Sequence, residues 1–233
     1  MIRSIRPARK HLALLTALVG MMMVQPHLGH RSELGGAISD AVLSAICVYI
    51  VFIVFGQERE RLVAVALLLP AFASNCGIYV LPDGIHVASE VVYHVCMVAF
   101  LGFAVAVILR DIFKKTVIGG DDVLGAFCGY MLLALVWANL YTLAYLLVPG
   151  VYTVSKDISW RMAEWHHRRA LFEYLSFTTL MTLGYSDITP VGPPAYTLTW
   201  LEVMVGQFYM AVVVAQLVGL KIAQALRGGP EAK

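Results

Sequence analysis

The stretch that decides the fold is Thr178-Thr179-Leu180-Met181-Thr182-Leu183-Gly184-Tyr185-Ser186-Asp187. Its first half is apolar and is typical of a helix end, whereas the Gly-Tyr pair and the acid that follow predict a turn. A hydrophobic span lies on each side of it. A segment that enters a membrane between two spans and breaks its helix must satisfy its bare backbone within protein or water. The carbonyl oxygens of such a backbone are suited to surround a cation.

The composition places the rest of the chain in a membrane. Of 233 residues, 60% are hydrophobic and 14% are charged, and the mean hydropathy is +0.77. Soluble domains are about one quarter charged. One membrane helix needs about 20 apolar residues, so roughly six helices fit. The net charge of +2 comes without a basic stripe of interleaved aromatics, so we expect the lipid bilayer and no nucleic acid as a partner. The cysteines all fall inside apolar spans and are interpreted as buried apolar side chains: Cys47, Cys76, Cys96 and Cys128.

The hydrophobic runs predict six spans and their orientation. The runs are 12–24, 37–55, 62–81, 87–109, 123–148 and 196–221. Lys and Arg gather at the amino terminus, after the second and fourth spans, and at the carboxyl end, whereas the other short loops hold only Arg31. The excess of positive charge on cytoplasmic loops then places both termini in the cytoplasm. We expect a multi-pass protein of the plasma membrane, or of the inner membrane of a bacterial cell.

The connector after the fifth span departs from this charge pattern. It carries four basic residues: Lys156, Arg161, Arg168 and Arg169. The stretch from Ser159 to Leu171 has few helix breakers, so we expect an amphipathic helix that covers the outer face. Two interpretations stay open. The helix is a solvated collar, or His166 and His167 make conductance respond to external pH.

Several motifs around the opening stretch occur together in one known family. Thr182-Leu183-Gly184-Tyr185-Ser186-Asp187 is similar to T-x-G-Y-G-D, with which the pore helix of potassium channels ends. The flanking runs 177–182 and 188–190 are similar to bacterial members, and Gly206 falls where these channels carry an inner-helix hinge. The resemblance covers about residues 121–226. It implies a homotetramer, in which each chain has three identical partner subunits and supplies one pore loop.

The resemblance also implies roles for individual residues. The ion-binding filter is Thr182, Leu183, Gly184, Tyr185 and Ser186, with K+ as the ion. Its support is Thr178, Thr179, Tyr174 and Asp187, where Asp187 accepts a hydrogen bond from Tyr174. The cavity and gate are Gly206, Gln207, Met210, Val214 and Gly219. For Gln207, a hydrogen bond to a neighbouring helix is the alternative. Downhill cation flux needs no catalytic group, cofactor or small-molecule substrate, so we expect no enzyme.

The filter needs a left-handed backbone conformation at two positions, and only one of them is a glycine. Replacing the water shell of K+ takes closely spaced oxygens, and aiming successive carbonyls at one axis takes alternating backbone hand, which glycine supplies. Gly184 meets this need. Ser186 stands where the family has its second glycine, and left-handed geometry there costs about 1–2 kcal/mol. We therefore predict a K+-preferring channel, with a weakly selective or non-conducting pore-like protein as the alternative.

The first four spans resemble a voltage-sensor bundle without its charges. The fourth span has no Arg or Lys before Arg110, so steep voltage gating is not expected. We expect an all-α membrane protein with two domains, a four-helix bundle over 1–118 and a pore domain over 119–233.

Polar residues inside the spans leave further alternatives. His86, Glu90 and His94 share one helical face, and Asp40 is placed to face them. Three interpretations of this face stay open: a metal site of an intramembrane metalloenzyme, a contact that responds to pH, and a structural polar seam. Glu202 needs a partner inside the sixth span, and the sequence does not identify it.

Overall fold

The computed structural model describes residues 10–28, 33–80, 83–156, 158–162, 165–185 and 187–227. Within these ranges the chain is almost entirely helical, as the sequence predicts. The helices are α1 (Lys10–Leu28), α2 (Glu33–Ile53), α3 (Glu58–Val80), α4 (Asp83–Lys114), α5 (Gly120–Leu147), α6 (Trp165–Leu180) and α7 (Pro193–Arg227). The short elements are strand β1 (Tyr152–Val154), the 3-10 helix η1 (Ser159–Met162) and strand β2 (Ile188–Pro190).

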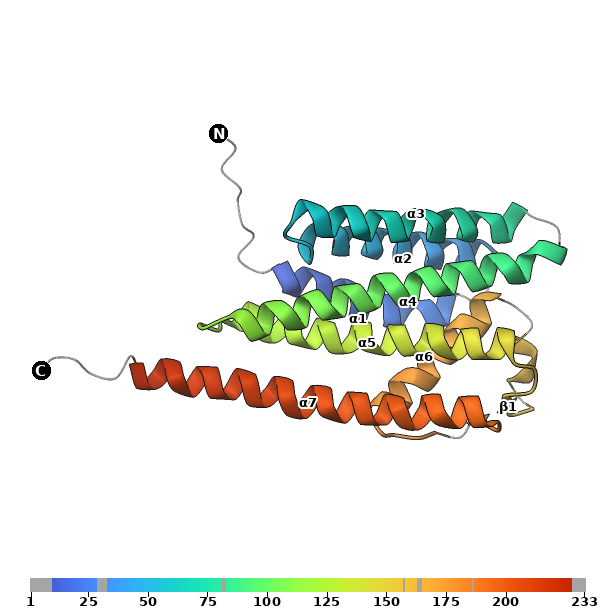
Figure 1. Ribbon diagram of the computed structural model, residues 1–233. Coiled ribbons are helices and arrows are strands. Elements are labelled where there is room, and N and C mark those ends of the chain that lie inside the picture. The colour runs from blue at the N-terminus through green and yellow to red at the C-terminus, as the bar shows by residue number, and fades with distance from the viewer. Residues whose placement is uncertain are drawn as a thin grey trace, which may run out of the picture.

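Six of the helices run along one common direction, and α6 lies obliquely to them (Figure 1). α5 occupies the middle, where it contacts α1 and α4 on one side and α6 and α7 on the other. Most of α5 is therefore buried, whereas most of α7 is exposed. The turn between α4 and α5 lies at the end of the molecule where α7 finishes, and β1 lies at the opposite end (Figure 1).

The apolar helices are those of a multi-pass membrane protein. Among the described residues, four helical segments are long and apolar enough to cross a membrane: Glu58–Gly77, His86–Lys114, Gly120–Leu147 and Pro193–Leu226. Two shorter apolar segments, Lys10–Val24 and Ile38–Ile53, lie in α1 and α2. The predicted number of six spans therefore stays a prediction. Pro70 lies inside α3.

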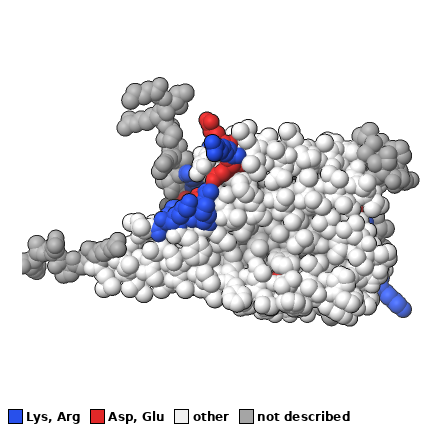
Figure 2. Space-filling model, viewed as in Figure 1, with Lys and Arg blue, Asp and Glu red and all other residues white. Residues whose placement is uncertain are grey.

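Most of the charged side chains on this face gather at one end, one basic side chain projects at the opposite end, and the broad middle carries almost none (Figure 2). The end with most of the charges holds the α2–α3 and α4–α5 connections, with Arg59, Arg61, Lys114 and Lys115 exposed. Arg110 pairs there with Glu60 at 2.6 Å, which explains why α3 and α4 extend beyond the predicted spans into their charged flanks. An uncharged belt between polar ends is the surface that a bilayer requires.

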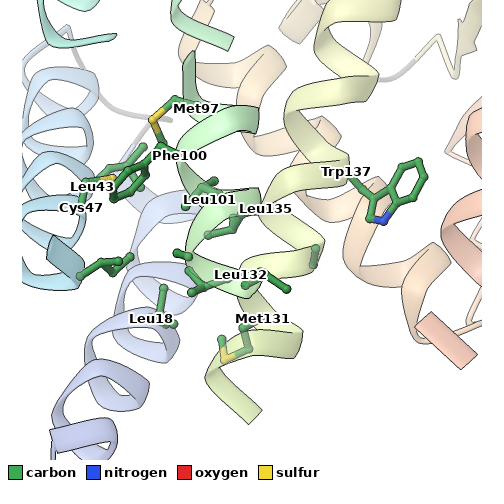
Figure 3. Packing of buried hydrophobic residues seen from close by; sticks show 14 of the residues in the cluster. Leu18, Leu43, Cys47, Met97, Phe100, Leu101, Met131, Leu132, Leu135 and Trp137 are labelled. Carbon is green, nitrogen blue, oxygen red and sulfur yellow. The ribbon is translucent and has the colours of Figure 1, made fainter. Parts of the chain in front are cut away.

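The core contains side chains of all seven α-helices, and one part of it lies between α1, α2, α4 and α5. Figure 3 shows Leu43 and Cys47 of α2 facing Phe100 of α4, with Leu132 of α5 and Leu18 of α1 further along the same interface. All five side chains are buried. A single continuous cluster thus joins the amino-terminal helices to α5. Whether residues 1–118 and 119–233 act as separate domains stays a prediction.

The expected amphipathic collar over Ser159–Leu171 is wrong. Residues 159–162 form η1, and a new helix, α6, begins at Trp165 and continues to Leu180. His167, Arg168 and Arg169 are buried rather than solvated. The physical reason is that carboxylates of α2 and α4 neutralise the two arginines, as described below.

Candidate functional site

The candidate site is the end of α6 and the turn that follows it. The Leu183 and Gly184 amides both donate to the Thr178 carbonyl, at 2.7 and 3.3 Å, and the Thr182 amide donates to the Thr179 carbonyl at 2.9 Å. These bonds satisfy carbonyls that a helix end leaves without partners. The chain consequently leaves α6 in a tight reversal rather than as an extended loop.

The backbone dihedral angle φ alternates in sign along this turn. Thr182 has φ 59° and Gly184 has φ 64°, and among the described non-glycine residues Thr182 is the one with positive φ. Left-handed geometry at a threonine costs about 1–2 kcal/mol, so the surrounding hydrogen bonds must hold it there. The predicted need for left-handed geometry at Gly184 is confirmed. Ser186, where the sequence predicts a conflict, lies outside the described residues.

Two tyrosines and an acid support the turn from the side. The Tyr174 hydroxyl donates to Asp187 Oδ2 at 3.2 Å, which confirms the pairing expected from the sequence. The Tyr185 ring stacks on the Tyr174 ring, with centroids 6.3 Å apart and planes 7° apart. Burial, together with the neighbouring Asp187 carboxylate, raises the pKa of Tyr174 above its usual value. The hydroxyl therefore keeps its proton, and the hydrogen bond, across the neutral range.

A short β-ribbon ties the turn to the α5–α6 connection. β1 pairs antiparallel with β2, with Thr153 opposite Thr189, and the Ser155 amide donates to the Asp187 carbonyl at 3.0 Å. Burial raises the pKa of the Tyr152 hydroxyl in β1. The sequence did not predict this ribbon because each strand has three residues, too few for a period to show.

The last residue of α6, Leu180, is held by both flanking helices. The Tyr130 hydroxyl of α5 donates to the Leu180 carbonyl at 3.0 Å. On the α7 side, a Cβ at Gly206 would lie 2.7 Å from Leu180 Cδ1. Gly206 is therefore needed for close approach of α7 to the end of α6. Its predicted role as a hinge is untested, and α7 runs through it as a continuous helix.

Glu202 of α7 has the partners that the sequence could not identify. Its side chain is fully buried, and the Tyr141 hydroxyl of α5 donates to Oε2. Its Oε1 lies 2.5 Å from the Ser176 hydroxyl of α6, which also lies 2.7 Å from the Ala134 carbonyl. One carboxyl group thus joins α5, α6 and α7 a single helical turn before the filter stretch. Tyr130, Tyr141 and Ser176 carry no local signal in the sequence, because their partners are distant along the chain.

The face formed by His86, Glu90 and His94 does not come together as a metal site. Glu90 pairs with Arg168, and His94 Nδ1 lies 2.7 Å from Asn139 Oδ1. Asp40 pairs with Arg169, and its Oδ2 lies 3.8 Å from His166 Nδ1. Among the residues that the structure describes, no group of three metal-binding side chains is close enough to hold an ion. The metal interpretation of this face is therefore not supported.

Most of the remaining predicted site residues are exposed in the single chain. The turn residues Thr182 to Tyr185 are exposed. The predicted cavity and gate residues of α7 other than Gly206 are exposed as well: Gln207, Met210, Val214 and Gly219. Thr178 and Thr179, predicted to support the filter, are buried in α6.

The fold and the site define a class: a multi-pass helical membrane protein with a half-length helix and a turn inserted between two long apolar helices. Residues 132–220 match the protein-family model described as "Ion channel". The matched range includes most of α5, all of α6, the turn and most of α7. No curated protein and no solved structure matches the chain. Residues 132–220 of this multi-pass helical protein are thus similar to an ion channel domain.

Proposed function

We propose that the chain is one subunit of a homotetrameric channel that conducts K+ in preference to Na+. In this proposal α6 is the pore helix and residues 182–186 form the filter. α5 and α7 are the outer and inner helices, and α1–α4 complete six spans. The observation that carries the proposal is the alternating backbone hand at Thr182 and Gly184, at the end of a helix held between two membrane helices. Alternation of this kind aims successive carbonyl oxygens toward one side.

Two further observations support the tetramer. Residues 182–185 and most of α7 are exposed in the single chain, and exposed side chains of α7 include Phe208 at 65% and Trp200 at 51%. Apolar surface of this extent marks either lipid contact or an interface. Backbone carbonyls at membrane depth require a water-filled or protein environment, which other copies around one axis would supply.

The charge distribution supports an orientation with both termini in the cytoplasm. Most of the exposed basic residues lie at the end with the α4–α5 connection, whereas the β-ribbon lies at the opposite end, where Lys156 is exposed (Figures 1 and 2). Positive charge favours the cytoplasmic side. The filter then opens to the outside, and the absence of Arg and Lys in α4 before Arg110 favours gating by a stimulus other than voltage.

Reversal potentials of the purified chain in liposomes, with K+ on one side and Na+ on the other, test the proposal. We expect K+ preference in the wild type and its loss in Gly184→Ala, because the new Cβ is strained at φ 64°. The matched control is Gly102→Ala in α4, where a Cβ meets open space. We expect Ser186→Gly to preserve or raise selectivity. Equal K+ and Na+ permeability in the wild type would favour the weakly selective alternative, and absence of any flux would favour the non-conducting one.

A further inference from the structure

The amino end of α6 carries positive charge, which would destabilise an isolated helix. It carries two basic residues, Arg168 and Arg169, after two histidines, and it contains no acidic residue. The amino end of a helix already bears partial positive charge, so cations there are destabilising. Both arginines are nevertheless buried, with side chains 9% and 5% exposed. Their compensation must come from other parts of the chain.

Arg168 reaches α4. Its Nη2 donates to both carboxylate oxygens of Glu90, at 2.6 and 2.5 Å, and its Nη1 donates to the Met162 carbonyl at 3.0 Å. The guanidinium also lies over the Tyr145 ring of α5, 5.6 Å from its centroid. Glu90 is as buried as its partner. In this buried ion pair, removal of either charge would leave the other buried without compensation.

Arg169 reaches α2. It donates to Asp40 Oδ1 through Nη1 and to the Ser39 hydroxyl through Nη2, the latter at 3.1 Å. Its Nε lies 3.5 Å from Glu173, one turn further along α6. Neighbouring residues of one helix thus hold two different helices of the amino-terminal half.

The other end of α6 carries the filter stretch. Leu180 lies about 18 Å along the helix axis from Arg168, at 1.5 Å of rise per residue. A helix of this length moves as a rigid rod, so a change in position at its start is transmitted to Thr182. The Tyr130 and Gly206 contacts fix only the far end. The start of the rod is fixed by the two buried ion pairs.

We infer that Glu90 and Asp40, acting through Arg168 and Arg169, are positioning residues of the filter, which makes the amino-terminal helices part of its scaffold. This inference rests on the proposed function. Catalytic sites show the same dependence, because a supporting shell that is about 1 Å too loose disables the groups that it holds. The amino-terminal bundle is then an active support rather than the passive one that the missing voltage-sensor arginines suggest.

The chain offers a matched control for this inference. Glu60 is a buried glutamate that pairs with an arginine, as Glu90 does, with 8% and 6% exposure for the two acids. The Glu60–Arg110 pair joins α3 to α4 at the end of the molecule opposite the β-ribbon (Figure 1). Glu60→Gln therefore removes a comparable charge far from α6.

The experiment compares full-length wild type, Glu90→Gln, Glu60→Gln and the charge swap Glu90→Arg/Arg168→Glu in liposomes. Two quantities are measured, the K+ to Na+ permeability ratio and the hydrogen exchange of backbone amides 171–180. For Glu90→Gln we expect the permeability ratio to fall about tenfold and amide exchange to accelerate about tenfold. Glu60→Gln should leave both quantities at the wild-type level, and the swap should recover most of both losses.

The outcomes separate this inference from the proposed function. A selective wild type with an equally selective Glu90→Gln variant overturns the inference alone, even if amide exchange accelerates, because the pair is then merely structural. Equal losses in Glu60→Gln and Glu90→Gln also overturn it. A wild type that conducts no K+ refutes the proposed function and the positioning role together, and the exchange data then report only whether the ion pairs hold α6.

Discussion

Substitution of Gly206 by alanine tests the close approach between α7 and the end of α6. The new Cβ would lie 2.7 Å from Leu180 Cδ1, 3.2 Å from its Cγ and 3.3 Å from its carbonyl oxygen. Ordinary contacts between carbon atoms lie at about 3.5–4.0 Å, so the leucine side chain must retreat by about 0.8 Å or more. Leu180 is fully buried.

The expected energy is the difference between two opposing effects. Overpacking costs about 1–3 kcal/mol, whereas replacing a helical glycine by alanine stabilises by about 0.5–1 kcal/mol. We therefore expect Gly206→Ala to lower the free energy of unfolding by about 0–2.5 kcal/mol. Gly102→Ala, which meets nothing within 4 Å, should instead be neutral or slightly stabilising.

Unfolding followed by tryptophan fluorescence in detergent measures these differences, since the chain contains four tryptophans. A double-mutant cycle adds Leu180→Ala, which alone costs about 2–5 kcal/mol. In the double variant the added methyl group fills part of the cavity, so the two changes should couple by about 1 kcal/mol. Equal stability of Gly206→Ala and Gly102→Ala would refute the packing argument. If Gly206→Ala were as stable as Gly102→Ala but had lost K+ flux, the hinge role predicted for Gly206 from the sequence would be favoured instead.

Two further predictions concern the contacts around α6. Glu202→Gln should change the free energy of unfolding by less than about 1 kcal/mol, because an amide can still bond Ser176 and Tyr141. Glu202→Ala should cost about 1–3 kcal/mol, because it removes the acceptor of the buried Tyr141 hydroxyl, whereas the Ser176 hydroxyl keeps the Ala134 carbonyl. Chemical unfolding in detergent compares the two, and equal losses would contradict the hydrogen-bond account. Tyr174→Phe removes the bond to Asp187 but keeps the ring that stacks on Tyr185. We expect near wild-type stability and a faster decline of current during sustained K+ flow, and unchanged current decay would show that this bond does not support the filter.

The sequence predicted those parts of the site that depend on local geometry. Gly184 is predicted because left-handed backbone favours glycine, whereas the Tyr174–Asp187 pair is implied by the resemblance to potassium channels. The long apolar helices were predictable from hydropathy, although their ends were not. α3 and α4 extend into charged sequence because Glu60 and Arg110 pair across them.

The connector was misinterpreted because its charges are neutralised from far along the chain. Arg168 pairs with an acid 78 residues earlier, and Arg169 pairs with one 129 residues earlier. A sequence window around the arginines contains neither acid, so basic residues in an amphipathic stretch indicate a solvated surface. The same limit applies to Glu202, whose partners Tyr141 and Ser176 lie on two other helices. Residues inside a bundle can be identified as needing partners, but pairwise distances decide which partners they have.

The buried acid of α7 also bears on how the chain is made. An acidic residue at the centre of a membrane helix raises the free energy of insertion by about 2.5–3.5 kcal/mol. The two partners of Glu202, Tyr141 and Ser176, both precede it in the sequence, so they are already synthesised when α7 leaves the ribosome. The hydroxyl groups that bind Glu202 are therefore already present when Glu202 enters the bilayer. Asp40 and Glu90, in contrast, are made before their arginines. The amino-terminal helices thus contain two acids whose arginine partners follow only with α6, and a chain truncated before Arg168 should be cleared by membrane proteolysis.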